Sequence, residues 1–337
     1  MLKFKALTPN RIDVLLSLNL NISRSQAANL IKSELVNLNS QIAKKPSQIV
    51  RIDDEIWVKK PSITPLENKF EVDFDVDIIY EDDDLLVLNK PSGITVHGAP
   101  SVKEATLVEW LNEKGFMLSN LNGEVRAGIV HRLDKGTSGA IVVAKNNAAH
   151  AALSAQLEDK SMNRIYLALI DFPLKEPCII DRALARSSQN RLKIAVSKSG
   201  GKAAKSAFVN LITQADAFGA KRITNADSST LISAKLFTGR THQIRAHLAS
   251  ISRHILGDDL YGFKRQNGKI ARIMLHAYML NFKHPRTGEL MSFIAPFDEV
   301  FATTLSDKFN QGLIDEKTAP KYLNNAFSDV SKWLCYT

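Results

Sequence analysis

The chain has 337 residues, of which 45% are hydrophobic and 23% charged, and it contains two cysteines. This composition excludes a disordered or fibrous protein, a disulfide framework and a cysteine-based zinc cluster, and the length favours two folding units over one. No run approaches the roughly 20 apolar residues of a membrane span, and the N-terminus lacks the apolar core of a signal peptide, so we expect a cytoplasmic protein with no membrane contact.

Charge is distributed unevenly along the sequence. The formal net charge of +9 divides into +5 for residues 1–60, −8 for 61–130, +9 for 131–260 and +3 for 261–337. Two basic blocks flanking an acidic one suggest two surfaces that follow a phosphate backbone. Surplus lysine on solvated faces is an equally good interpretation from charge alone.

The first 60 residues have a pattern of their own. Apolar spacing predicts helices within 11–20 and 23–35, the second with a capping box at Ser23, and short strands within 35–42 and 53–60. Two helices and a β ribbon give a small core with a broad cationic surface. Residues 11–58 resemble an S4 RNA-binding domain, with Ser40 where that family usually has glycine. The basic side chains expected to meet RNA are Arg24, Lys32, Lys44 and Lys45.

A linker is predicted at residues 61–75, because this stretch has two prolines, no sustained period and an acidic bias. The following residues predict strands at 85–90, 139–145, 163–170 and 229–239, and a helix at 146–160 capped by Asn146 or Asn147. Because strands and helices mix without a βαβ rhythm, the fold class expected for residues 76–304 is α+β with a mixed, mostly antiparallel central sheet. Residues 305–337 are predicted to form a helical tail.

Several catalytic patterns are absent from the sequence. Ser138 lacks the glycine spacing of a nucleophile elbow, the Gly- and Lys-rich stretch 197–206 lacks P-loop spacing, and the histidines of 242–254 lack zincin spacing. These absences argue against a metal site and a nucleotide-binding site.

One acidic residue stands out, because Asp134 lies in a loop with His131, Arg132 and Lys135. A lone carboxylate can act as a catalyst if a nearby arginine keeps it ionised and oriented. Arg240 is the predicted partner, since it lies where a strand gives way to a helix expected to be capped by Thr241, a position that does not suit a cation in the helix dipole. A fold-stabilising ion pair is the alternative for these two residues.

Several motifs in order resemble the RluA family of pseudouridine synthases. HRLDKGTSG at 131–139 matches the family's catalytic motif, RIYLALI at 164–170 its second segment, and TGRTHQIRAHL at 238–248 with GDDLYG at 257–262 its later segments. LLVLNKPSGITVH at 85–97 matches the entry strand and loop. The resemblance covers residues 78 to about 300.

The resemblance implies a pseudouridine synthase fold, the isomerisation of uridine to pseudouridine in RNA, and no cofactor. It makes Asp134 the catalytic aspartate, Arg240 its ion-pair partner and Tyr166 the aromatic that stacks on the target base. Arg132 would enter the space left by the flipped nucleotide. His131 and His242 are expected to orient loops, with His131 and Lys135 beside the RNA. Tyr166 as an ordinary core tyrosine is the alternative.

The S4 domain favours large-subunit ribosomal RNA as the substrate of a monomeric enzyme. The same chemistry on tRNA is one alternative. An RNA-binding assembly factor with a dispensable catalytic site is another.

Overall fold

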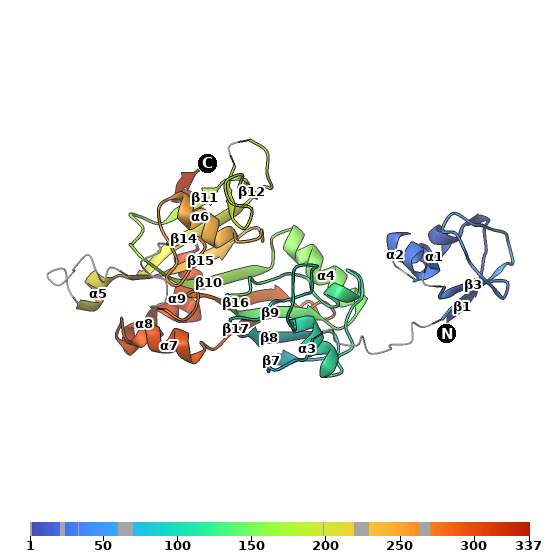
Figure 1. The fold of residues 1–337 in the computed structure, drawn as a ribbon, viewed down its shortest axis with the longest axis horizontal. Coiled ribbons are helices and arrows are strands. Elements are labelled where there is room, and N and C mark those ends of the chain that lie inside the picture. Colours follow the sequence, from blue (N-terminus) through green and yellow to red (C-terminus); the bar gives the residue numbers. More distant parts are fainter. Residues whose placement is uncertain are drawn as a thin grey trace. The chain divides into compact units, whose positions relative to one another are not determined.

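The computed structural model describes residues 2–20, 24–32, 34–59, 70–197, 199–218, 229–262 and 270–337. The chain divides into two compact units, 1–68 and 69–337 (Figure 1). The capping box predicted at Ser23 and most of the predicted linker lie outside the described residues. None of the helices in the described ranges is long and apolar enough to cross a membrane.

The first unit combines two helices with small antiparallel sheets. Its elements are β1 (Leu2–Lys5), β2 (Asn10–Arg11), α1 (Ile12–Leu20), α2 (Arg24–Lys32), β3 (Val36–Leu38), β4 (Gln41–Ile42), β5 (Ile49–Val50) and β6 (Glu55–Val58). The order β1-β6-β3-β4 forms one sheet, and β2 pairs with β5. Fully buried Ile12 and Leu16 of α1 pack with Ala27 and Ile31 of α2 because they repeat at helical spacing.

The turn between β3 and β4 needs left-handed backbone at two residues. Asn39 and Ser40 both have positive φ, 48° and 68°. The side chain of Asn39 donates to Asp54 at 2.7 Å and accepts from the backbone N–H of Glu55 at 2.8 Å. These bonds help to hold a conformation that non-glycine residues seldom adopt.

The second unit is built around one ten-stranded sheet of order β18-β11-β14-β15-β10-β16-β9-β8-β7, with β17 also paired to β16. All of these pairings are antiparallel except β9 with β16 and β11 with β18, so the predicted α+β class with a mostly antiparallel sheet is confirmed. The strands are β7 (Asp77–Glu81), β8 (Leu85–Lys90), β9 (Ser138–Ala144), β10 (Asn163–Ile170), β11 (Cys178–Asp181), β14 (Lys205–Ile212), β15 (Thr230–Leu236), β16 (Leu275–Lys283), β17 (Leu290–Ile294) and β18 (Leu334–Tyr336); β12 (Leu184–Arg186) and β13 (Ile194–Val196) form a separate hairpin.

Helices cover this sheet, with α7 to α9 together at one end (Figure 1). They are α3 (Leu107–Glu113), α4 (Asn147–Glu158), α5 (Gln214–Phe218), α6 (Gln243–Ser250), α7 (Glu299–Ser306), α8 (Gln311–Thr318) and α9 (Pro320–Ala326). Asn146 caps α4 by accepting from the backbone N–H of Ala149, as one of the two predicted caps.

Two predicted features of this unit are wrong. The tail is helical through α9 and a short 3-10 helix at Val330–Lys332, but its last residues form β18, which pairs in parallel with β11. Thr241 does not cap α6: the cap is His242, which has a left-handed φ of 53° and no capping side-chain bond. Thr238 and the backbone N–H of Arg240 donate instead to the side chain of Gln243, which closes the turn before the helix.

The short parallel pairing of β9 with β16 fixes the start of the strand that follows the Asp134 loop. A side chain at Gly139 would place its Cβ 2.3 Å from the carbonyl oxygen of Ala277, and the φ of Gly139 is 109°. Only glycine permits this approach of two backbones. Ser138 and His276 reinforce it with a buried hydrogen bond of 2.7 Å.

Candidate active site

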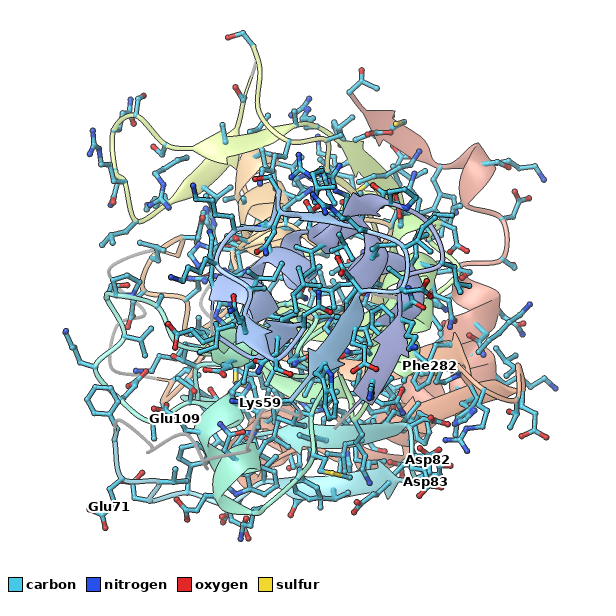
Figure 2. All side chains as sticks on the ribbon, turned by 90° about the vertical axis from the view of Figure 1, so that its right-hand side faces the viewer. Lys59, Glu71, Asp82, Asp83, Glu109 and Phe282 are labelled. Carbon is cyan, nitrogen blue, oxygen red and sulfur yellow. The ribbon has the colours of Figure 1, made fainter. Side chains whose placement is uncertain are left out.

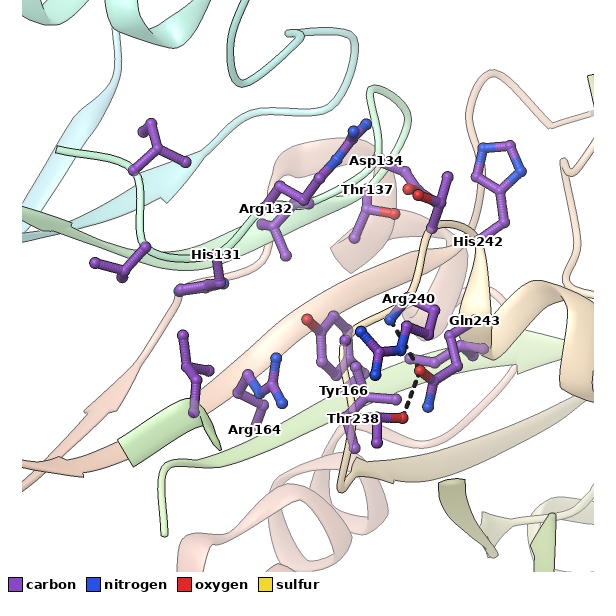
Figure 3. Close-up of a pocket in the computed structure, with 18 of the residues that line it drawn as sticks. His131, Arg132, Asp134, Thr137, Arg164, Tyr166, Thr238, Arg240, His242 and Gln243 are labelled. Carbon is purple, nitrogen blue, oxygen red and sulfur yellow. Dashed lines mark hydrogen bonds between the residues drawn. The ribbon is translucent and has the colours of Figure 1, made fainter. Parts of the chain in front are cut away.

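A cavity of about 590 Å³ lies against the centre of the large sheet. Most of its wall comes from three stretches far apart in the sequence: the 129–137 loop, the start of β10, and residues 236–245 at the end of β15 and the start of α6 (Figure 3), and the end of α4 adds residues that include Glu158. Asp134, Tyr166 and Arg240 all line it. The fold therefore brings together the three residues that the sequence singled out as catalytic.

Asp134 forms an ion pair with Arg245. Nη1 of Arg245 lies 3.3 Å from Oδ2 of Asp134, and the two side chains are 6% and 15% exposed. Arg245 also makes two hydrogen bonds to Asp258, at 2.7 and 2.9 Å. Burial alone would lower the pKa of Arg245, but the bonds and charges of Asp258 and Asp134 outweigh it and raise that pKa. A permanently charged guanidinium thus holds the Asp134 carboxylate in the cavity wall.

The predicted ion pair between Asp134 and Arg240 is wrong. Among the described residues, the ion pair of Asp134 is with Arg245. Arg240 is exposed at the cavity wall, and its Nε donates to the carbonyl oxygen of Ala203 at 3.0 Å. The physical reason is the turn before α6, which directs Arg240 outward and Arg245, in the first turn of the helix, inward.

The loop that carries Asp134 is tied to the loop after β8. The ammonium group of Lys90, a fully buried residue, donates to the carbonyl oxygens of Pro91 and Ile94 at 2.7 and 2.8 Å and approaches that of Lys135 at 3.4 Å. The backbone N–H of Gly93 also donates to Lys135, at 2.8 Å. Burial, and then the charge of Arg272, lower the pKa of Lys90 to about 7, against the opposing charge of Asp134.

The cations beside Asp134 in the sequence do not neutralise it. Lys135 pairs with Glu104 at 2.6 Å on the surface, and Arg132 is exposed at the cavity wall.

The basic residues predicted to bind RNA in the first unit have different surroundings. Arg24 pairs with Asp13 at 3.0 Å, while Lys32, Lys44 and Lys45 are exposed.

Tyr166 presents its side chain to the cavity from β10 (Figure 3). Tyr166 is 5% exposed. All residues of β10 from Arg164 to Ile170 are buried, so both faces of this strand are covered. Burial raises the pKa of Tyr166 to about 12. The hydroxyl therefore stays protonated at neutral pH, and the ring offers the cavity an apolar wall.

The two histidines beside the catalytic motifs are neutral at physiological pH. Burial, and then the charge of Arg164, lower the pKa of His131 to about 3, and its Nε2 accepts from the backbone N–H of Val142 at 3.2 Å. Burial also lowers the pKa of His242, whose Nδ1 lies 3.1 Å from the hydroxyl of Tyr261. These bonds agree with the predicted orienting role of both rings.

Sequence reasoning missed Arg245 and Asp258 as the groups that hold Asp134. Both lie in quoted motifs, Arg245 in TGRTHQIRAHL and Asp258 in GDDLYG. The available signal was helical spacing, since Arg245 precedes the apolar Leu248 by three residues, and residues three apart share one face of a helix.

One group of potential metal ligands lies away from the cavity. Asp82 follows β7 beside Asp83 (Figure 2), and oxygen and nitrogen atoms of Asp82, Asp84 and His284 lie within 4.8 Å of one another. Arg286 already pairs with Asp84 at 2.7 Å, and His284 with Asp82 at 2.8 Å. Side chains of the protein therefore already bind both carboxylates of this group.

Comparison with known proteins agrees with this geometry. The family model described as RNA pseudouridylate synthase matches residues 84–250, and the S4 domain model matches residues 10–56. The chain is 45% identical to an RNA pseudouridine synthase of Helicobacter pylori over 96% of this chain and 98% of the relative. It is 39% identical to the ribosomal large subunit pseudouridine synthase D of Zymomonas mobilis, over 85% of this chain and 89% of the relative.

A solved structure gives the same fold. Human RNA pseudouridylate synthase domain containing 1 matches with a TM-score of 0.51 and 26% sequence identity, over 66% of this chain and 84% of the human chain. Long alignments to pseudouridine synthases, together with the matched S4 domain, leave one assignment: the chain belongs to the RluA family of RNA pseudouridine synthases, with an S4 domain ahead of the synthase domain.

Proposed function

We propose that Asp134 is the catalytic residue with which this RNA pseudouridine synthase isomerises uridine. The observation that carries the proposal is the Asp134–Arg245–Asp258 chain, which fixes one carboxylate at the wall of a cavity. In the reaction the bond between N1 of uracil and C1′ of ribose breaks, the base turns, and a bond forms between C5 and C1′. The proton on C5 is released and N1 gains one, so no oxidant or cosubstrate is consumed.

Tyr166 and Arg132 have supporting roles in this proposal. A uridine within a stem must leave its stack to reach Asp134, at a cost of a few kcal/mol. The buried ring of Tyr166 provides a surface for the flipped base, which recovers about 1–3 kcal/mol. Arg132 is exposed at the cavity wall, where a cation can occupy the gap left in the RNA. His131 and Lys135 border the same RNA.

The proposed substrate is large-subunit ribosomal RNA, in the cytoplasm. Two observations support it: the S4 domain, and the name of the Zymomonas mobilis relative, a ribosomal large subunit pseudouridine synthase. Lys32, Lys44, Lys45 and Arg24 of the first unit would add contacts to phosphates outside the cavity.

Tritium release tests the catalytic proposal. RNA labelled at uridine C5 is incubated with wild type, Asp134→Asn and Glu104→Gln, the last removing an exposed carboxylate that pairs with Lys135. We expect release by wild type and Glu104→Gln, and at least about a thousandfold slower release by Asp134→Asn with unchanged thermal stability. Equal rates for all three proteins contradict the catalytic role of Asp134.

Carbodiimide mapping of total RNA from a strain lacking the gene tests the substrate. We expect modified positions of large-subunit ribosomal RNA to disappear, and to return with the wild-type gene but not with the Asp134→Asn gene. Loss of tRNA positions alone makes the substrate tRNA. Growth defects that the Asp134→Asn gene rescues without restoring any modification indicate an assembly factor.

A further inference from the structure

Arg164 is a buried cation that forms no ion pair with any of the described residues. It precedes Tyr166 by two residues on β10, so both side chains leave the strand on the same face, and both line the cavity. Arg164 is 6% exposed, and its Nε is buried without a hydrogen-bond partner. None of the ion pairs within the described ranges includes its guanidinium.

Such an arrangement is unfavourable in the free protein. Moving a charged group out of water costs several kcal/mol unless charges or hydrogen bonds compensate it. Burial indeed lowers the pKa of Arg164, although a guanidinium still keeps its proton at neutral pH. A ligand that supplies negative charge therefore gains more here than at an exposed arginine.

A second hydrogen-bond donor lies near Arg164 in the cavity wall. Because Nε2 of His131 accepts a backbone hydrogen bond, the proton of this neutral ring lies on Nδ1, which is buried and has no partner. Figure 3 shows Arg164 beside Tyr166 on the side of the cavity where His131 lies, and the charge of Arg164 acts on the His131 ring. Both donors line the cavity.

The opposite wall leaves room for the guanidinium. A Cβ at residue 239 would lie 2.8 Å from Nη1 of Arg164, so Gly239 keeps this space open. The same TGR segment carries Arg240 at the cavity wall. The cavity thus contains a cationic subsite beside Tyr166, distinct from the carboxylate that Arg245 holds.

We propose that Arg164, with Nδ1–H of His131, binds a phosphodiester group of the RNA next to the flipped uridine. The subsite rests on the proposed function, because it is occupied only when RNA enters the cavity. A phosphodiester has two non-bridging oxygens that accept hydrogen bonds, and its negative charge can pair with the guanidinium of Arg164. Uracil is neutral and presents an N–H group as well as carbonyl oxygens, so it compensates this site less well.

Stability separates a ligand-binding arginine from a structural one. In Arg164→Met the unpaired charge is replaced by an apolar side chain, so we expect the ligand-free variant to unfold at the same or a higher temperature than wild type. A structural role predicts the reverse. A lower unfolding temperature for Arg164→Met, with Arg164→Lys equal to wild type, overturns the proposal.

Binding to RNA with one altered linkage locates the contact. Fluorescence anisotropy is measured with an RNA fragment containing a mapped target uridine, unmodified or with a neutral methylphosphonate in place of the phosphate on either side. We expect one of the two methylphosphonates to weaken wild-type binding about tenfold. Arg164→Met should bind unmodified RNA about tenfold more weakly, and lose nothing further with that methylphosphonate. Its salt dependence should correspond to about one phosphate contact fewer.

Lys321→Met is the matched control, because Lys321 is exposed on α9 and does not line the cavity. It should respond to the methylphosphonate as wild type does. Equal sensitivity of Arg164→Met and wild type to both methylphosphonates overturns the phosphate contact. A second outcome also overturns the proposal: Arg164→Met binds intact RNA more weakly than wild type, but the two proteins bind equally to RNA that lacks the target base. The guanidinium then contacts the base. Tritium release by wild type on the same RNA tests the proposed function separately.

Discussion

Arg164 and Arg245 line the same cavity, and both are 6% exposed, yet their surroundings are opposite. Arg245 meets two carboxylates, Asp258 at 2.7 Å and Asp134 at 3.3 Å. Arg164 meets none among the described residues, and its Nε has no partner. The pKa of Arg245 is raised and that of Arg164 is lowered, although burial opposes the charge of both.

The difference separates two uses of a buried cation. A compensated guanidinium is part of the folded structure and can hold a catalytic carboxylate in place. An uncompensated one lowers the stability of the free protein and favours an anionic ligand.

Removing the main partner of Arg245 should give the largest effect. In Asp258→Ala the guanidinium loses both short hydrogen bonds while it stays buried, so we expect the free energy of unfolding to fall by about 3–5 kcal/mol. Asp258 also accepts from the backbone N–H groups of Leu260 and Tyr261, which adds to the loss. Urea unfolding measures it.

Asp181→Ala is the control for that measurement. Asp181 pairs with Lys205 at 3.2 Å, and these side chains are 43% and 39% exposed. Removal of such an exposed pair should cost less than about 1 kcal/mol. If both variants lose equal stability, burial does not distinguish the two ion pairs.

Lys90 offers an intermediate case, because three carbonyl oxygens surround its buried ammonium group in place of a carboxylate. Its pKa is about 7 in the folded protein and near 10.4 in the unfolded chain. Between these values the unfolded chain binds more protons, so the stability of wild type should rise with pH relative to Lys90→Met, by roughly 2 kcal/mol from pH 7 to pH 9.

Urea unfolding of the two proteins at both pH values measures this difference. Below about pH 6 the two curves should run parallel, because Lys90 is then protonated in both the folded and the unfolded state. A constant difference from pH 7 to pH 9 would mean that the carbonyl oxygens compensate the charge fully.

Arg240 is an exposed cation at the wall of the same cavity. Because its side chain is exposed and makes no ion pair with Asp134, Arg240→Gln should change the free energy of unfolding by less than about 0.5 kcal/mol. We expect kcat to stay within about twofold and KM to rise, as for a lost phosphate contact. Arg245→Lys, in contrast, should lower kcat. A hundredfold fall in kcat for Arg240→Gln would restore the role first predicted for it.

The sequence allowed much of this site to be predicted. The hydrophobic periodicity predicted β8 to β10 and α4. The motif resemblance predicted that Asp134 and Tyr166 belong to one active site, and both line the same cavity. The partner of Asp134 could not be predicted, because two arginines lie five residues apart in one motif and the turn between them decides which one points inward. That turn depends on Gln243, which binds Thr238 and the backbone of Arg240.

The lack of a partner at Arg164 was also beyond the sequence. A basic residue at this position of a strand suggests an exposed end, whereas the strand is buried by layers on both faces. The strand β18 depended on pairing with β11, more than 150 residues earlier in the chain, and local propensity does not report such a partner.

The smallest effect on stability is expected for Lys44 and Lys45 of the first unit. These two cations are exposed, in contrast to the buried Arg164 and Arg245. Water solvates them, so the double variant Lys44→Gln, Lys45→Gln should change the free energy of unfolding by less than about 0.5 kcal/mol. RNA binding should still weaken, and the dependence of log K on log salt should fall by about two phosphate contacts. Glutamine at Lys3 and Lys332, exposed lysines that already pair with Glu55 and Asp329, is the matched control, and an equal change in its salt dependence would show that overall charge, not Lys44 and Lys45, governs binding.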